Sequence, residues 1–284
     1  MMKTENADGN GLRIRAGRVA VQGGHVAYRM REGPTDQLAL VVFHQSPLSG
    51  WTHTPLFDHL AHSGSVILFD TPGYGDSSHA RDLKTIDEYA FRLGEALEQL
   101  RGDRRVVVLG QHTGGHLAML YAADNAETTA GVIFNGVALY TDAERGQRAA
   151  RYAPRVAPGD DGEHVATFWK RIRELYPAVD LATCNRMLAD YLLAEPDYAH
   201  AYRAVFACDV EPVAKAFAAT GIPSRVIVGS EDVIHHMQQR VCERFGSDMV
   251  TLPGLTDFAA LEAPALFAAA VDDFITSVDA GPSH

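Results

Sequence analysis

The chain has 284 residues, a formal net charge of −11, and hydrophobic and charged contents of 46% and 21%. This composition is typical of a globular protein with a large core and excludes a disordered chain. The acidic balance argues against a nucleic-acid-binding surface, which needs clustered lysine and arginine. Three widely spaced cysteines indicate reduced thiols, and the sequence therefore predicts a cytoplasmic protein.

The chain begins with a polar stretch, MMKTENADGNG, which lacks the apolar segment of a signal peptide. Residues 12–31 then alternate apolar and polar side chains on either side of Gly23-Gly24, which predicts an antiparallel hairpin at a sheet edge. The fully apolar residues 38–43 predict a buried strand and are too short to span a bilayer. A short helix is expected around residues 55–61.

The next segments alternate strands and helices. Residues 65–69 predict a strand that runs into a glycine-rich turn, Asp70-Thr71-Pro72-Gly73-Tyr74-Gly75-Asp76-Ser77. A capping box at residues 85–88 marks the start of an amphipathic helix. The apolar runs 106–109 and 131–134 predict two further buried strands. Alternation of this kind favours a parallel, right-handed, doubly wound sheet.

The pattern changes at about residues 141–220, which contain no apolar strand but several helical stretches rich in aromatic side chains. Strands resume at residues 224–228 and 249–252, and a closing helix follows them. The sequence therefore predicts an α/β core made of residues 1–140 and 221–284, with a helical lid inserted at residues 141–220.

A sharp turn is expected between the strand at residues 106–109 and the helix that starts at Thr113. The residues Gly110-Gln111-His112-Thr113-Gly114 place glycine two positions before and two positions after His112, where a tight backbone leaves no room for a Cβ. Histidine is among the few non-glycine residues enriched at positive φ. The spacing predicts a strained elbow that holds His112 out over the sheet.

Taken together, these motifs resemble the α/β-hydrolase superfamily. Its turn Asp-x-Pro-Gly-x-Gly-x-Ser matches residues 70–77, and its common His-Gly-x-Pro stands where this chain has residues 44–47, His-Gln-Ser-Pro. The resemblance implies an eight-stranded, mostly parallel sheet with a helical lid. It also implies a Ser-Asp-His triad at positions that hold His112, Asp232 and Asp257 here, so the serine nucleophile of the usual elbow, Gly-x-Ser-x-Gly, is replaced by histidine.

The altered triad predicts a general base at the elbow. Asp257 is expected to accept one ring N–H of His112, which leaves the other ring nitrogen free to take a proton from the substrate. Asp232 occupies the acid position of the superfamily. The sequence leaves open whether Asp232 takes part in the chemistry or caps its own loop.

Further residues are expected to bind the substrate. The resemblance implies an oxyanion hole formed by the backbone amide of Thr113 and by that of Gln45 or Ser46. His44 either supports that loop or touches the substrate. The large aromatic side chains expected to line the pocket are Trp51, Phe168 and Trp169.

No metal or cofactor is expected. His235 and His236 are adjacent, but no further ligands stand at a spacing that a zinc site would use. The expected partner is an apolar or aromatic small molecule, and neither nucleic acid nor a membrane is expected to bind. A homodimer is an assembly that the sequence leaves open.

Three functions fit these residues. The first is a cofactor-independent enzyme that uses His112 as general base on a bulky apolar or aromatic molecule, in C–C bond formation or cleavage, cyclisation or isomerisation. The composition of the chain, which is rich in Ala, Arg and Val, suggests a GC-rich bacterial source and natural-product metabolism for this first function. The second is a hydrolase of an ester, lactone or epoxide in which His112 activates water. The third is a non-catalytic small-molecule-binding protein of the same fold.

Overall fold

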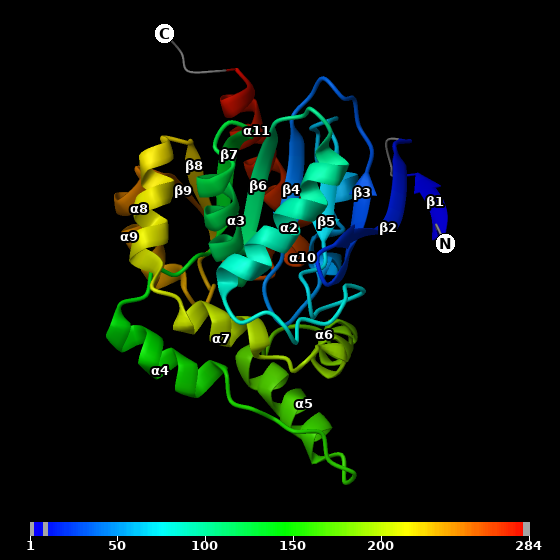
Figure 1. Ribbon diagram of the computed structural model, residues 1–284, viewed down its shortest axis with the longest axis vertical. Helices are drawn as coiled ribbons and strands as arrows, with labels where there is room; N and C mark the ends of the chain where they lie inside the picture. The colour runs from blue at the N-terminus through cyan, green and yellow to red at the C-terminus, as the bar shows by residue number, and fades with distance from the viewer. Residues whose placement is uncertain (1–2, 8–10, 281–284) are drawn as a thin grey trace.

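The computed structural model describes residues 3–7 and 11–280. At its centre lies one sheet of nine strands in the order β1-β2-β3-β5-β4-β6-β7-β8-β9 (Figure 1). The strands β1, β2, β3 and β5 pair antiparallel, and those from β5 through β4 to β9 pair parallel. The strands are β1 (Lys3–Ala7), β2 (Arg13–Val21), β3 (Gly24–Arg31), β4 (Ala39–Phe43), β5 (Val66–Phe69), β6 (Val106–Gln111), β7 (Thr129–Asn135), β8 (Ser224–Gly229) and β9 (Asp248–Leu252).

The predicted mostly parallel sheet is confirmed, and the eight strands expected from the sequence are β2 to β9. The additional strand, β1, pairs with β2 at the edge of the sheet. It falls in the polar N-terminal stretch, whose residues KTENA have no apolar alternation from which a strand could have been predicted.

Helices cover both faces of the sheet. The core on one face includes side chains from α2 and α3, and the core on the other face includes side chains from α1, α10 and α11. The central strands β4, β5 and β6 are fully buried, which explains their unbroken apolar sequences. The helices that lie outside the segment between β7 and β8 are α1 (Leu56–His59), α2 (Ile86–Arg101), α3 (Thr113–Asp124), α9 (Gln238–Phe245), α10 (Ala259–Glu262) and α11 (Pro264–Asp279).

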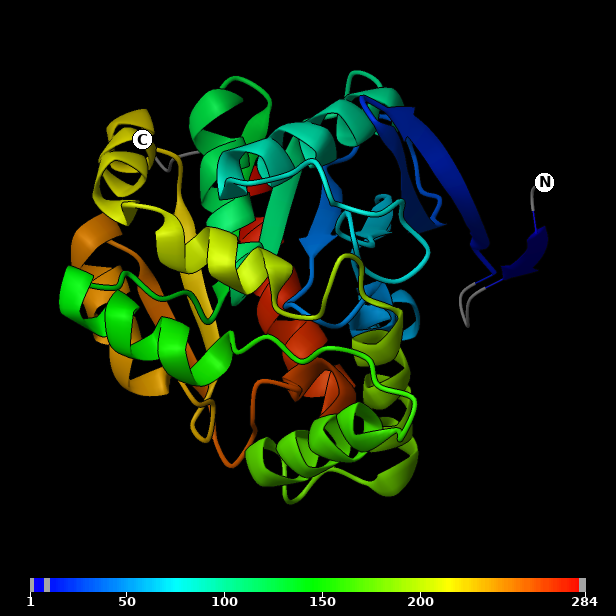
Figure 2. The ribbon, with the colours of Figure 1, turned by 60° about the horizontal axis from the view of Figure 1, so that its bottom comes forward.

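Five helices lie between β7 and β8 in the chain: α4 (Asp142–Tyr152), α5 (Glu163–Leu175), α6 (Leu181–Leu193), α7 (His200–Ala207) and α8 (Val210–Thr220). The first four spread across one end of the sheet and are called the cap below (Figure 2). The fifth, α8, packs against α3. The division of the chain into core and lid at residues 141–220 stays a prediction.

The arrangement places the carboxyl ends of the parallel strands under the cap (Figure 1). His44, His112 and Asp232 follow β4, β6 and β8, so residues far apart in the sequence meet at one edge of the sheet. Within residues 3–7 and 11–280, none of the helices combines the length and apolarity needed to cross a bilayer.

Candidate active site

The turn between β6 and α3 has the strained geometry that the sequence predicts. His112 has φ 48° and is the one non-glycine residue with positive φ in the described part of the chain. A Cβ on Gly110 would lie 2.2 Å from the Gly114 carbonyl oxygen, and one on Gly114 would lie 1.9 Å from the Phe43 carbonyl oxygen. Only glycine fits at these positions. Holding a histidine in this conformation costs on the order of 1–3 kcal/mol, which is typical of functional sites.

The elbow brings His112 onto Asp232. Nε2 of His112 lies 2.9 Å from Oδ2 of Asp232, whose side chain is fully buried, while the His112 side chain is 15% exposed. Oδ1 of Asp232 accepts a hydrogen bond from the Ile234 amide at 2.8 Å. Because an ionised carboxylate only accepts, Nε2 carries the proton and Nδ1 of the neutral ring keeps a lone pair. Asp232 therefore both orients His112 and braces its own loop.

Gly136 makes this pairing possible. It follows β7 with φ 69°, and its carbonyl oxygen accepts a hydrogen bond from the His112 amide at 2.8 Å. A Cβ at this position would lie 3.0 Å from Cδ2 of His112 and 3.1 Å from Oδ2 of Asp232. A side chain at Gly136 would therefore press on both members of the His112–Asp232 pair.

The expectation that Asp257 accepts the His112 proton is wrong, because that hydrogen bond goes to Asp232. Asp257 is 1% exposed, and neither of its carboxylate oxygens has a hydrogen-bond partner. Burial, together with the nearby negative charge of Asp232, raises the pKa of Asp257 to about 6, against the attraction of His112 and the polar side chains of Gln45 and Tyr176. Asp257 is therefore a buried carboxyl group near the base rather than its orienting partner.

The two carboxylates also act on the basicity of His112. Burial lowers the pKa of His112, but the charge and hydrogen bond of Asp232, together with the charge of Asp257, outweigh it. The net result is a pKa above the usual histidine value.

The loop after β4 holds the residues expected to form an oxyanion hole. Nδ1 of His44 donates to the Gln45 carbonyl oxygen at 2.9 Å, and Nε2 accepts from the Thr71 amide at 2.8 Å. Both ring nitrogens of His44 are therefore used to hold the loop, and burial lowers its pKa. The side-chain nitrogen of Gln45 and the hydroxyl of Ser46 are buried without hydrogen-bond partners. Which backbone amide of this loop would face a substrate stays a prediction.

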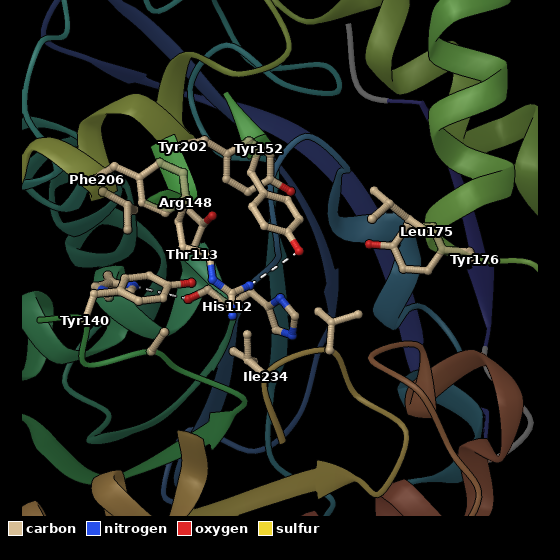
Figure 3. Close-up of a pocket in the computed structure, with 14 residues that line it drawn as sticks. His112, Thr113, Tyr140, Arg148, Tyr152, Leu175, Tyr176, Tyr202, Phe206 and Ile234 are labelled. Carbon is tan, nitrogen blue, oxygen red and sulfur yellow. Dashed lines mark hydrogen bonds between the residues drawn. The ribbon is translucent and has the colours of Figure 1, made fainter. Parts of the chain in front are cut away.

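A cavity opens above the elbow and is walled by the cap (Figure 3). The space that the centre of a water molecule can reach measures about 60 Å³. That is room for a few water molecules, so a bulky ligand would have to displace side chains of the cap. Its polar and aromatic lining residues include His112, Thr113, Tyr140, Arg148, Tyr152, Tyr176, Tyr202 and Phe206.

The three aromatic residues expected to line the pocket lie outside this cavity. Trp51 is buried and donates from Nε1 to Asp190 at 2.8 Å. Phe168 packs against the rings of Tyr191 and Tyr198, and Trp169 packs partly buried against the core. The aromatic side chains of residues 141–220 that do line the cavity, Tyr152, Tyr176, Tyr202 and Phe206, are not the ones that were predicted. The sequence did not indicate which face of each cap helix turns toward the cavity.

Another lining residue could have been found from the sequence. His116 lies in the first turn of α3, four residues after His112, and its side chain lines the same cavity. His116 is buried, and burial lowers its pKa to about 4. His116 therefore lines the cavity as a neutral ring.

His235 and His236, the adjacent pair noted in the sequence, lie in the short helix that precedes α9. Among residues 3–7 and 11–280 there is no group of three or more His, Cys, Asp or Glu side chains placed to hold a metal ion.

The parallel sheet, the cap and the strained elbow at the carboxyl end of β6 define an enzyme-like α/β fold with its candidate site beneath an insertion. The sequence model of the alpha/beta hydrolase family matches residues 40–270, and the chain belongs to this family.

Named relatives of this chain are hydrolases. A proline iminopeptidase from Thermoplasma volcanium is 30% identical over 128 residues, which cover 44% of this chain and 43% of that enzyme. A proline iminopeptidase from Saccharolobus solfataricus is 28% identical over 130 residues, which cover 44% and 41%. The chain thus matches less than half the length of these curated relatives.

Solved structures share the fold over nearly the whole chain. A hydrolase from Pseudomonas aeruginosa superimposes with a TM-score of 0.75 and 20% identity, covering 92% of this chain and 98% of that one. An N-acyl homoserine lactonase complexed with N-butanoyl homoserine gives 0.77 and 21%, covering 95% and 99%. At this identity the likeness shows the fold alone.

Proposed function

We propose that this protein is a cofactor-independent enzyme in which His112 acts as a general base on an apolar, aromatic small molecule. The observation that carries the proposal is the 2.9 Å contact between Nε2 of His112 and Oδ2 of Asp232. With Nε2 bound to Asp232, the neutral ring of His112 keeps a lone pair on Nδ1. The ring is partly exposed and lines the cavity, so this lone pair can take a proton from the substrate. The reactions that fit are C–C bond formation or cleavage, cyclisation and isomerisation through an enolate or phenolate.

The surroundings of His112 support both halves of such a proton transfer. When the ring takes a proton, the imidazolium forms beside the carboxylate of Asp232 and near that of Asp257, which raise its pKa. The negative charge left on the substrate needs hydrogen-bond donors. The amide of Thr113, the first residue of α3 and part of the cavity wall, has no acceptor within the helix and lies at its positive dipole end.

A second candidate is hydrolysis of an ester, lactone or epoxide by water that His112 activates. Family membership favours it, since the named relatives are proline iminopeptidases and the solved structures of the same fold include a lactonase. The cavity has room for the water that this reaction needs.

The base can be tested before any substrate is known. Nitrogen NMR of histidine-labelled protein should show a neutral His112 ring protonated at Nε2 and titrating above the unperturbed value of ~6.5. His112→Ala removes the signal and identifies it. A ring protonated at Nδ1, or one that titrates below the unperturbed value, would refute the proposed base.

Turnover separates the two reactions. Aromatic β-diketones report C–C cleavage, and nitrophenyl esters and lactones report hydrolysis. His112→Ala should abolish whichever activity the wild type shows, while His59→Ala, at an exposed site at the end of α1 that does not line the cavity, should leave it unchanged. Fluorophosphonate labelling of a serine, or full activity in His112→Ala, would contradict a histidine base.

A further inference from the structure

One charged side chain in the cavity is not used by the proposed chemistry. Arg148 lies on α4 and lines the same cavity as His112 (Figure 3). Its guanidinium carbon lies 5.3 Å from the ring centre of Tyr152 and 5.9 Å from that of Tyr140. Among the described residues its side chain makes one hydrogen bond, a long one of 3.4 Å from Nη1 to the Tyr152 hydroxyl. The described residues provide no carboxylate partner for it.

Several other arginines of the cap have strong acceptors. The carboxylate nearest in sequence, Glu144, lies one turn earlier on α4, but it binds Arg240 at 2.9 Å and caps its own helix. Three arginines bind acceptors of their own: Arg145 binds Asp142, Arg203 binds Asp197, and Arg173 donates to the carbonyl oxygens of Val179 and Pro177. Arg148 therefore keeps most of its five N–H donors for something that enters the cavity.

We propose that Arg148 binds a carboxylate group of the substrate, so that the substrate is an aromatic acid rather than a neutral aromatic molecule. This inference rests on the proposed function, because it names the substrate class of the same cavity. A guanidinium presents paired N–H donors in a plane that matches a carboxylate. The rings of Tyr140, Tyr152, Tyr202 and Phe206 supply aromatic surface for the rest of the molecule.

The charge of the protein favours a local cation in the site of such a ligand. The chain carries a formal net charge of −11, and Asp232 and Asp257 lie next to the base, so an anionic substrate meets a repulsive field around the site. A single unpaired guanidinium in the cavity offsets that repulsion locally. It also fixes which end of the molecule enters first, and so which proton faces His112.

The test compares isosteric ligands that differ only in charge. Benzoate and 2-naphthoate are measured against benzamide and 2-naphthamide by calorimetry or ligand-observed NMR at pH 7.5, with acetate as the carboxylate without a ring. Wild type should bind each aromatic carboxylate at least tenfold more tightly than its amide, and more tightly than acetate. Arg148→Gln should lose the preference, and Arg148→Lys should keep part of it.

Arg151→Gln is the matched control. Arg151 lies on the same helix with its guanidinium carbon 5.4 Å from the same Tyr152 ring, but it is exposed and does not line the cavity. It should keep the full preference. Equal binding of acid and amide by wild type, or a preference unchanged in a folded Arg148→Gln, would overturn the inference. Either result with His112 still protonated at Nε2 leaves the base intact, so the two proposals fail separately.

Discussion

Replacing Asp257 by asparagine should stabilise the protein at alkaline pH. In the folded state Asp257 is buried with both oxygens unpartnered, and burial raises its pKa from 3.8 to about 6. The folded state therefore binds this proton more tightly than the unfolded state. The stability that the protonated Asp257 carboxyl contributes is fully present below pH ~4 and is lost as pH rises through 6. A difference of about two pKa units corresponds to roughly 3 kcal/mol of unfolding free energy.

The assay is chemical denaturation of wild type, Asp257→Asn and the exposed control Asp36→Asn between pH 4 and pH 8. At pH 8 Asp257→Asn should exceed wild type by up to ~3 kcal/mol, or roughly 5 °C in Tm for a chain of this size, and the gain should vanish near pH 4. Asp36→Asn should follow wild type throughout. Equal pH dependence in wild type and Asp257→Asn, or a loss of stability at pH 8, would show that the carboxyl group is not held uncompensated in the fold.

Three further results are expected. Asp232→Asn should lower kcat at least tenfold and move the acid limb of the pH–rate profile downward, because the partner that most raises the pKa of His112 is removed; an unmoved limb would show that Asp232 does not set this pKa. Gly136→Ala should cost activity as well as stability, since its Cβ meets both members of the pair; full activity would deny that their spacing matters. His112→Ser with Asp257→His should gain hydrolysis of an activated ester that neither single variant shows, because serine, histidine and Asp232 then occupy the superfamily's triad positions; an equally active single variant would refute that assignment.

Most of the fold could be predicted from the sequence because its signals are local. The buried strands are continuous apolar runs, and the elbow is marked by Gly110 and Gly114, which no other residue type could replace sterically. Strand β1 could not be predicted, because it pairs with β2 through backbone hydrogen bonds, and its polar side chains show no strand pattern.

The site could be predicted only in part because it depends on distances between loops. Sequence position placed His112, Asp232 and Asp257 at the ends of strands, but it could not say which carboxylate the imidazole reaches. The side chains that the cap turns toward the cavity were harder still to predict. Arg148 and Arg151 stand three residues apart on one helix, and only the packing of α4 decides that the first lines the cavity and the second faces solvent.

The two buried carboxylates differ in how well the fold compensates their charge, although both raise the pKa of His112. Asp232 is satisfied by His112 and by the Ile234 amide, so its charge is held in place to orient the ring. Asp257 has no such partners, and its pKa of about 6 lets it lose or keep a proton at little cost. On the proposed function, proton transfer to His112 creates a cation beside Asp257, which favours its ionised form at that moment. A carboxyl group that weakens the fold in the resting enzyme thereby stabilises the charge that the reaction forms, and this accounts for keeping it buried beside the base.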